Sequence, residues 1–349
     1  MRSRTSIYAL SPVGLIVLAI CCLGFEPALA RFEFSQLHMG TQFKIILYCE
    51  SAQAATTLSS NAFERIAEID AITSDYLETS ELMLVCKTAA GSKIRVSEDL
   101  FRVLETSQEI AERSDGAFDV TIGPVVRLWR RARRIGELPD SNRLAQAMDL
   151  IGYHKLRLDR PSRSVALERA GMLLDLGGIA KGYAVDAAMR VLKQQGVTRA
   201  LVAGGGDISV MGAPPGSAGW TIAVAPNGGE GQDGLYLCLR DRAVSTSGDA
   251  HQYVEIGGVR YSHIVDPKTG LGLKGHQSVT VVALDCTTSD ALATAASVMG
   301  PAKGSRLIDS TPGAAALFTQ TTARGESMVE TYRWKEVPKT AQPKKEKAN

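Results

Sequence analysis

Apolar residues recur at helical spacing in five stretches of the chain. In the clearest of them, Leu58, Ala62, Ile66 and Ile69 fall on one face of a helix over residues 54–72. The same spacing predicts further helices at residues 100–113, 140–151, 180–195 and 289–299. Short apolar and β-branched runs predict strands at residues 42–49, 200–203, 220–225, 234–239, 277–284 and 314–319.

These elements alternate irregularly and include several hairpin-like pairs. The pattern indicates an α+β fold of mixed sheets and packed helices rather than a strictly doubly wound parallel sheet. Because the sequence holds no internal repeat and no Gly/Ser linker, we expect one domain over residues 31–335, made of two intimately joined lobes. Residues 336–349 are polar and Lys-rich, which predicts a disordered tail.

Residues 1–30 have the pattern of a secretory signal. Arg2 and Arg4 precede an apolar run from Pro12 to Phe25, and Ala28 and Ala30 supply the small side chains that a signal peptidase reads. The run is shorter than the roughly 20 residues that span a membrane. We therefore expect a cleaved signal and an exported protein, with a retained N-terminal membrane anchor as the alternative.

Composition narrows the class of protein further. The chain is 45% hydrophobic and 22% charged, as in an ordinary globular protein, and its formal net charge is +2. A balance so close to neutral, without interleaved basic and aromatic residues, gives no reason to expect a nucleic-acid partner. The cysteines beyond the signal form no CxxC pair, which argues against a metal cluster and favours buried thiols: Cys49, Cys86, Cys238 and Cys286.

The segment LLDLGGIAKGYAVD, residues 173–186, has the pattern of a phosphate site. An apolar run ends at Asp175, Gly177 and Gly178 make a turn, and a helix begins near Ile179. Backbone N–H groups at such a start favour phosphate, and bare carbonyls in the turn can face a cation. Lys181 lies one turn into the helix, within reach of a phosphate oxygen. The alternative is a plain strand–turn–helix junction with an exposed lysine.

Two later segments carry further candidate chemistry. Asp290 and Thr294 are four residues apart on a helix, so a carboxylate and a hydroxyl could offer Mg²⁺ two oxygen ligands from one face. The alternative is that Ser289 or Asp290 only caps the helix, with Thr294 packed against the turn above. His263 lies just before the rigid turn DPKTG, where it is a candidate general base or phosphate contact, or else a structural histidine.

Glycine and hydroxyl residues mark three other turns. They are GAFDVT at residues 116–121, AGGGD at residues 203–207, and AVSTSG at residues 243–248. In AGGGD something approaches the backbone closely, although the segment is neither a GKS/T phosphate loop nor a GxGxxG fingerprint. The GxSxG and HExxH motifs are absent from the sequence.

Eight collinear blocks together resemble the ApbE family, the FAD:protein FMN transferases. The resemblance spans about residue 37 to residue 320, nearly all of the chain beyond the signal. The blocks are MGTQFKI, TSDYLETSEL, GAFDVTIGPVVRLW, LDLGGIAKGYAVD, AGGGDISVMG, AVSTSGD, RYSHIVDPKTG and TSDALATAASVMG.

The resemblance implies an activity and a set of site residues. Family members bind FAD with Mg²⁺, cleave its pyrophosphate and attach FMN through a phosphoester to a Thr or Ser of a partner redox protein, releasing AMP. An exported member would act in the bacterial periplasm. By their match to the family's motifs, the implied metal ligands are Asp290, Thr294 and the carbonyl of Gly178. The implied FAD contacts are Met39, Tyr76, Ala117, Phe118, Asp119, Asp175, Lys181 and Ile264. We assign His263 as the general base.

The chain departs from the family at one block, and two other activities stay open. Where the family continues from Ser80-Glu81 toward an Asn, this chain has Cys86 and a more apolar segment, which bears on that loop's contacts and on acceptor preference. A Mg²⁺-dependent FAD pyrophosphatase would use the same site with water as nucleophile. A non-catalytic FAD-binding protein is the third possibility, although it would not require a positioned base.

Overall fold

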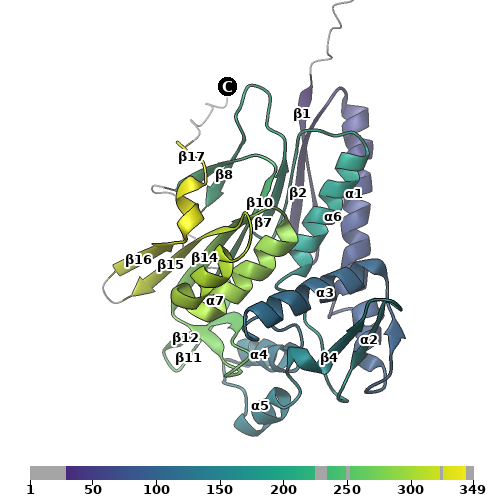
Figure 1. Ribbon diagram of the computed structural model, residues 1–349, viewed down its shortest axis with the longest axis vertical. Coiled ribbons are helices and arrows are strands. Elements are labelled where there is room, and N and C mark those ends of the chain that lie inside the picture. Colours follow the sequence, from purple (N-terminus) through teal and green to yellow (C-terminus); the bar gives the residue numbers. More distant parts are fainter. Residues whose placement is uncertain (1–28, 225–233, 249–251, 323–324, 343–349) are drawn as a thin grey trace, which may run out of the picture.

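An eight-stranded antiparallel sheet is the centre of the molecule (Figure 1). The structure is a computed structural model that describes residues 29–224, 234–248, 252–322 and 325–342. The strand order is β1-β2-β6-β7-β10-β14-β15-β16. In that order the strands are Ala30–His38, Thr41–Cys49, Ala200–Gly204, Asp207–Met211, Arg242–Gly248, His276–Ala283, Ala315–Thr322 and Gly325–Glu330.

Both faces of this sheet are covered, which explains why β2 is apolar almost throughout. Phe43, Ile45 and Leu47 pack into the large core beneath the helices, whereas Ile46 points to the second core on the opposite face. The helices of the first face are α1 (Ala52–Thr73), α6 (Ala180–Gln194) and α7 (Cys286–Asp309). The second face is covered by β8 (Trp220–Val224), β9 (Leu235–Leu239), β17 (Lys339–Thr340) and the 3₁₀ helix Tyr332–Glu336.

Smaller elements form the lower part of the molecule in Figure 1. In one group α2 (Glu81–Lys87) and α3 (Glu98–Arg113) pack on α1. The sheet of β3 (Ile94–Arg95), β5 (Ser164–Leu167) and β4 (Leu156–Asp159) packs on α2 through β5. A second group has its own small core around Trp129. It consists of α4 (Gly123–Ile135), α5 (Ser141–Met148), β11 (Tyr253–Ile256), β12 (Val259–Val265) and β13 (Gly272–Lys274).

The five predicted helices are all present, and the last is longer than expected. α7 begins at Cys286 and continues past a kink at Gly300 and Pro301 to Asp309. The sequence analysis did not predict helices α2 and α4 or several strands, among them β1, β7 and β10. Strand β10 covers the AVSTSG segment, so the turn expected there is wrong. The predicted disorder from residue 336 is wrong at its start, because Lys339 and Thr340 pair with β9; residues 343–349 lie outside the described part.

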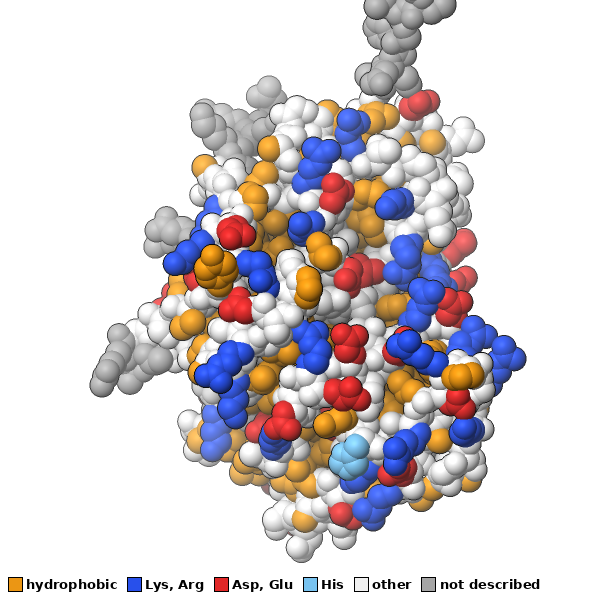
Figure 2. All heavy atoms as spheres, in the orientation of Figure 1, with side chains coloured by type: hydrophobic (Ala, Val, Ile, Leu, Met, Phe, Trp, Pro, Cys, Tyr) orange, Lys and Arg blue, Asp and Glu red, His pale blue; other side chains and the backbone are white. Residues whose placement is uncertain are grey.

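Two expectations concern residues 1–28, which lie outside the described residues, so the predicted signal and the alternative anchor stay predictions. Within the described part, no helix is both long and apolar enough to cross a membrane. The four cysteines there are free thiols, and Cys286 is buried. Acidic and basic side chains are interspersed over the face seen in Figure 2, without a large patch of one sign.

Candidate active site

A single cavity of about 1020 Å³ collects every residue that the sequence analysis placed in the site. It lies where the β1–β2 and β6–β7 turns meet the start of α6, the first turns of α7, and β12. The twelve residues are Met39, Tyr76, Ala117, Phe118, Asp119, Asp175, Gly178, Lys181, His263, Ile264, Asp290 and Thr294. Segments up to 255 residues apart in the chain (Met39 to Thr294) thus border one cavity, whose volume is close to the upper end of the range of ligand pockets.

Asp175 shapes the turn that leads into α6. Its Oδ1 accepts a hydrogen bond from Gly177 N at 2.9 Å, and its Oδ2 accepts one from Arg130 Nη2 at 2.9 Å. Burial and the nearby Asp75 raise the pKa of Asp175 above its ordinary value, while Arg130 opposes that shift. The carboxylate therefore ties the glycine turn to α4.

Helices α6 and α7 exchange carboxylate caps at their first turns. Asp290 of α7 accepts from Gly182 N of α6 at 3.1 Å, and Asp186 of α6 accepts from Cys286 N of α7 at 2.9 Å. A Cβ on Gly182 would lie 2.3 Å from Cys286 O, so only glycine allows this approach. The two helix starts are consequently fixed against each other.

Thr294 lies directly beside the glycine turn. A Cβ on Gly178 would be 3.0 Å from Thr294 Oγ1, and Ser247 Oγ lies 3.3 Å from the same hydroxyl. Asp290, one helical turn earlier, borders the same cavity. The three residues predicted as metal ligands from their match to the family therefore lie together.

The side chain of Lys181 extends from α6 toward two buried carboxylates. Its Nζ donates to Gly177 O at 3.0 Å and lies 3.4 Å from Asp207 Oδ2 and 3.6 Å from Asp290 Oδ2. Burial alone would lower the pKa of Lys181, but Asp290 and Asp207 outweigh it and hold the side chain as an ammonium. We call Lys181, Asp207 and Asp290 the lysine–carboxylate cluster.

Asp207 is the site residue that the sequence analysis missed. It is 2% exposed, and burial together with Asp290 raises its pKa well above the ordinary value, against the effect of Lys181. In the AGGGD segment the glycines indicated a close approach to the backbone, and no separate signal in the sequence pointed to the carboxylate of Asp207. Ser247 of the AVSTSG segment likewise gains a role only from its contact with Thr294.

His263 and Ile264 reach the cavity from β12. The ring Nδ1 of His263 lies 3.1 Å from Gln252 O. A carbonyl can only accept, so this contact places a proton on Nδ1 and makes Nε2 the basic nitrogen of the neutral ring. The backbone N of Ile264 donates to Ser262 Oγ at 3.1 Å. The geometry allows His263 to accept a proton.

The far end of the cavity is built around Arg130. Its guanidinium lies 4.3 Å from the ring centre of Tyr76 and 2.5 Å from Asp75. Tyr76 is 75% exposed, so one face of its ring is available to a flat ligand. Met39 has φ of 50° in the β1–β2 turn, a left-handed conformation that is costly outside glycine.

Asp119 contributes to the cavity wall in a structural way. Its Oδ1 accepts from Thr121 N at 2.8 Å and from Thr121 Oγ1 at 2.6 Å. Burial raises the pKa of this carboxyl group. Its side chain thus holds the 117–121 turn in shape.

Comparison with known proteins agrees with the fold and with the resemblance seen in the sequence. The model of the ApbE family matches residues 39–318. The FAD:protein FMN transferase of Treponema pallidum (strain Nichols) is 30% identical over 325 residues, covering 88% of this chain and 90% of that protein. A protein of the same name from Klebsiella pneumoniae (strain 342) is 30% identical over 275 residues, covering 78% and 84%.

Solved structures show the same architecture. The flavin transferase ApbE from Vibrio cholerae superposes with a TM-score of 0.81 at 27% identity, covering 88% of this chain and 99% of that one. The apo form of the Pseudomonas stutzeri flavinyl transferase ApbE gives 0.79 at 30% identity, covering 89% and 97%. The predicted α+β class is confirmed.

Fold and relatives together define an enzyme of the FAD:protein FMN transferase class. The chain belongs to the ApbE family, as the eight sequence blocks indicated.

Proposed function

We propose that this enzyme transfers FMN from FAD to a Thr or Ser hydroxyl of a partner redox protein, in a reaction that requires Mg²⁺ and releases AMP. The observation that supports the proposal is that the residues predicted to bind phosphate, to bind a metal ion and to accept a proton all line one cavity of about 1020 Å³. A binding protein would need neither a base nor a buried lysine–carboxylate cluster beside its ligand's phosphates.

The residues present fit a magnesium ion. Asp290, Thr294 and the carbonyl of Gly178 are hard oxygen donors of the kind Mg²⁺ prefers, and the absent side chain at Gly178 leaves space beside the hydroxyl. No group of three or more His, Cys, Asp or Glu side chains gathers as a metal centre in the described part. A bound Mg²⁺ would supply charge neutralisation at the pyrophosphate.

The chain's own residues would then position and activate the reactants. Lys181 binds a phosphate oxygen, and His263 Nε2 takes the proton of the acceptor hydroxyl. The hydroxyl oxygen forms a bond to the phosphorus on the flavin side, and the bond from that phosphorus to the bridging oxygen breaks. AMP leaves with the bridging oxygen, so atoms and charge balance.

An assay of the products tests this proposal. The enzyme is incubated with FAD, Mg²⁺ and a candidate acceptor protein, and the mixture is run on a denaturing gel. Flavin fluorescence that stays with the acceptor supports transfer. Free FMN and AMP without labelled acceptor would contradict transfer and support FAD pyrophosphatase activity. Unchanged FAD would contradict both activities and support a binding function.

We further propose that the enzyme acts after export, in the bacterial periplasm. The proposal rests on the signal pattern of residues 1–30, which includes the Ala28-Leu29-Ala30 cleavage pattern. Fractionation of cells that make the full-length chain would test it, together with N-terminal sequencing of the mature protein. Recovery of uncleaved enzyme in the membrane fraction would instead support a retained anchor.

A further inference from the structure

The AGGGD turn is shaped around the side chain of Lys181. Gly205 and Gly206 form the two-residue connection between β6 and β7, with φ of 63° and 99°. A Cβ on Gly205 would lie 2.9 Å from Lys181 Cδ and 3.1 Å from Lys181 Cε. Asp207, which directly follows this turn, forms an ion pair with the Lys181 ammonium. The absence of a side chain at Gly205 therefore leaves space for the aliphatic part of Lys181, and Asp207 pairs with its charge.

The ammonium lies between two buried carboxylates at similar distances. Asp207 Oδ2 is 3.4 Å away and Asp290 Oδ2 is 3.6 Å away, and the two residues are 2% and 3% exposed. A single positive charge faces two negative charges, so the cluster as a whole can attract a cation. The ion pair with Lys181, however, neutralises part of the negative charge of Asp290 and so weakens its attraction for a metal ion.

We infer that Asp207 is a positioning residue that shares the Lys181 ammonium with Asp290 and so limits how strongly the lysine pairs with Asp290. By taking up part of the ammonium's charge, Asp207 leaves more of the negative charge of Asp290 to a divalent cation and keeps the lysine facing the donor's phosphates. Without Asp207, the ammonium would move to the remaining buried carboxylate, Asp290, and compete there with the metal. This inference rests on the proposed function, because it takes Asp290 as a metal ligand.

Metal binding by a set of variants tests the role of Asp207. Mn²⁺ serves as the probe, titrated into the purified full-length protein without FAD and followed by electron paramagnetic resonance. We expect Asp207→Asn to raise the Kd for Mn²⁺ by about tenfold or more, in the range seen for groups that support metal ligands. Lys181→Met should lower the Kd, because it removes the competing charge.

The double variant distinguishes positioning through Lys181 from a direct effect of Asp207 on the metal. If Asp207 acts through Lys181, adding Asp207→Asn to Lys181→Met changes the Kd several-fold less than it does in the wild-type background. If Asp207 binds the metal itself or attracts it only through space, the factor is the same in both backgrounds, and the inference is overturned. A wild-type protein that binds no Mn²⁺ would overturn the metal requirement of the proposed function and the inference with it.

Two glycine variants give an independent test that leaves every charge in place. Gly205→Ala pushes on the Lys181 stem and should weaken Mn²⁺ binding, and Lys181→Met should cancel that effect. Gly206→Ala is the matched control, because it strains the same turn while the Cβ would have only Thr246 O within 4 Å, at 3.5 Å. Circular dichroism first shows that each variant is folded. Equal weakening by both alanines would contradict the inference.

Discussion

At the scale of single residues, the site depends on groups whose partners fix their chemical state. The contact between His263 Nδ1 and Gln252 O leaves Nε2 as the basic nitrogen. The contact between Asp290 Oδ2 and Gly182 N orients the carboxylate toward the turn before α6. These contacts are compatible with the roles proposed for the two side chains, proton acceptance by His263 and cation binding by Asp290.

Replacing His263 by Gln should slow the chemical step and leave FAD bound. Removal of a general base typically costs about 10²- to 10⁴-fold in rate. Single-turnover transfer and the FAD dissociation constant, measured side by side, check this expectation, and added imidazole should restore part of the rate. If FAD affinity falls as much as the rate does, His263 is a binding residue instead.

Replacing Asp290 by Asn should abolish Mg²⁺-dependent FAD binding and turnover. The amide oxygen can still accept from Gly182 N, so the helix contact is kept while the charge is lost. We expect metal affinity to fall by more than about 100-fold, beyond the range found for groups outside the metal's own ligands. Isothermal titration with FAD at several Mg²⁺ concentrations measures the effect; wild-type behaviour would remove Asp290 from the metal site.

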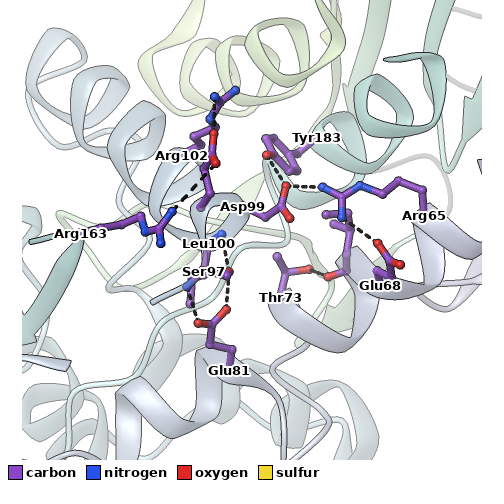
Figure 3. Close-up of polar contacts among 12 residues, drawn as sticks. Arg65, Glu68, Thr73, Glu81, Ser97, Asp99, Leu100, Arg102, Arg163 and Tyr183 are labelled. Atoms are coloured by element: carbon purple, nitrogen blue, oxygen red, sulfur yellow. Dashed lines mark hydrogen bonds and ion pairs between the residues drawn. The ribbon is translucent and has the colours of Figure 1, made fainter. Parts of the chain in front are cut away.

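At the scale of elements, Asp99 joins three helices through its side-chain hydrogen bonds (Figure 3). This residue of α3 accepts from Arg65 of α1 at 2.5 Å and from Tyr183 of α6 at 2.7 Å. Burial alone would raise its pKa, but the hydrogen bonds from Arg65 and Tyr183 outweigh burial and lower the pKa below the ordinary 3.8. Since α6 also carries Lys181, this network holds the helix from which the site is built.

Asp99→Asn should destabilise the protein in a pH-dependent way. A carboxyl group with a lowered folded-state pKa stabilises the fold above its unfolded-state pKa and loses that effect as the pH falls. At pH 7 the loss should be about 1.5–3 kcal/mol, as for hydrogen bonds to a charged group, and it should shrink below about pH 4. Urea unfolding at both pH values measures it.

Glu68→Gln is the matched control for that experiment. Glu68 pairs with the same Arg65 at 2.8 Å, but its side chain is 62% exposed. A surface ion pair of this kind contributes about 0–1 kcal/mol. Equal destabilisation by the two variants at pH 7 would show that the burial of Asp99 is unimportant.

At the scale of the whole molecule, periodicity predicted the long elements and missed those that depend on tertiary context. α4 has buried Val125, Trp129 and Ala132 at helical spacing, but it begins with Gly123 and Pro124, which are residue types typical of turns. The proline in fact stands in the first turn of the helix, where it needs no hydrogen bond. β1 was missed because it is a half-exposed edge strand, without a continuous apolar run.

Site residues that lie within sequence motifs could be predicted. Contacts that depend on how separate elements pack could not. Asp290, Thr294 and Gly178 line the cavity, and their place there could be expected from the sequence. Each of them lies within a sequence block that matches the family's motifs. The pairing of Asp207 with Lys181 could not be expected in this way, since it depends on how β6 and β7 lie beside α6. Sequence spacing carries no information on that approach.

Trp334 allows the stability of the fold to be tested separately from the chemistry of the site. Trp334 is fully buried in the second core, on the sheet face opposite α1, α6 and α7, and it does not line the site cavity. Its Nε1 has no hydrogen-bond partner in the described part of the chain. Trp334→Ala should lower the free energy of unfolding by about 3–5 kcal/mol, because it leaves a large cavity.

Trp334→Phe should cost far less, under about 1.5 kcal/mol, since the aromatic volume is mostly kept and the buried N–H is removed. Denaturant unfolding of both variants gives the two values. The KM for FAD of the folded fraction should match that of the wild type in both, because the ring lies outside the cavity. A changed KM in Trp334→Phe would mean that the second core transmits strain through the sheet to the site, and that the two functions of the fold are coupled.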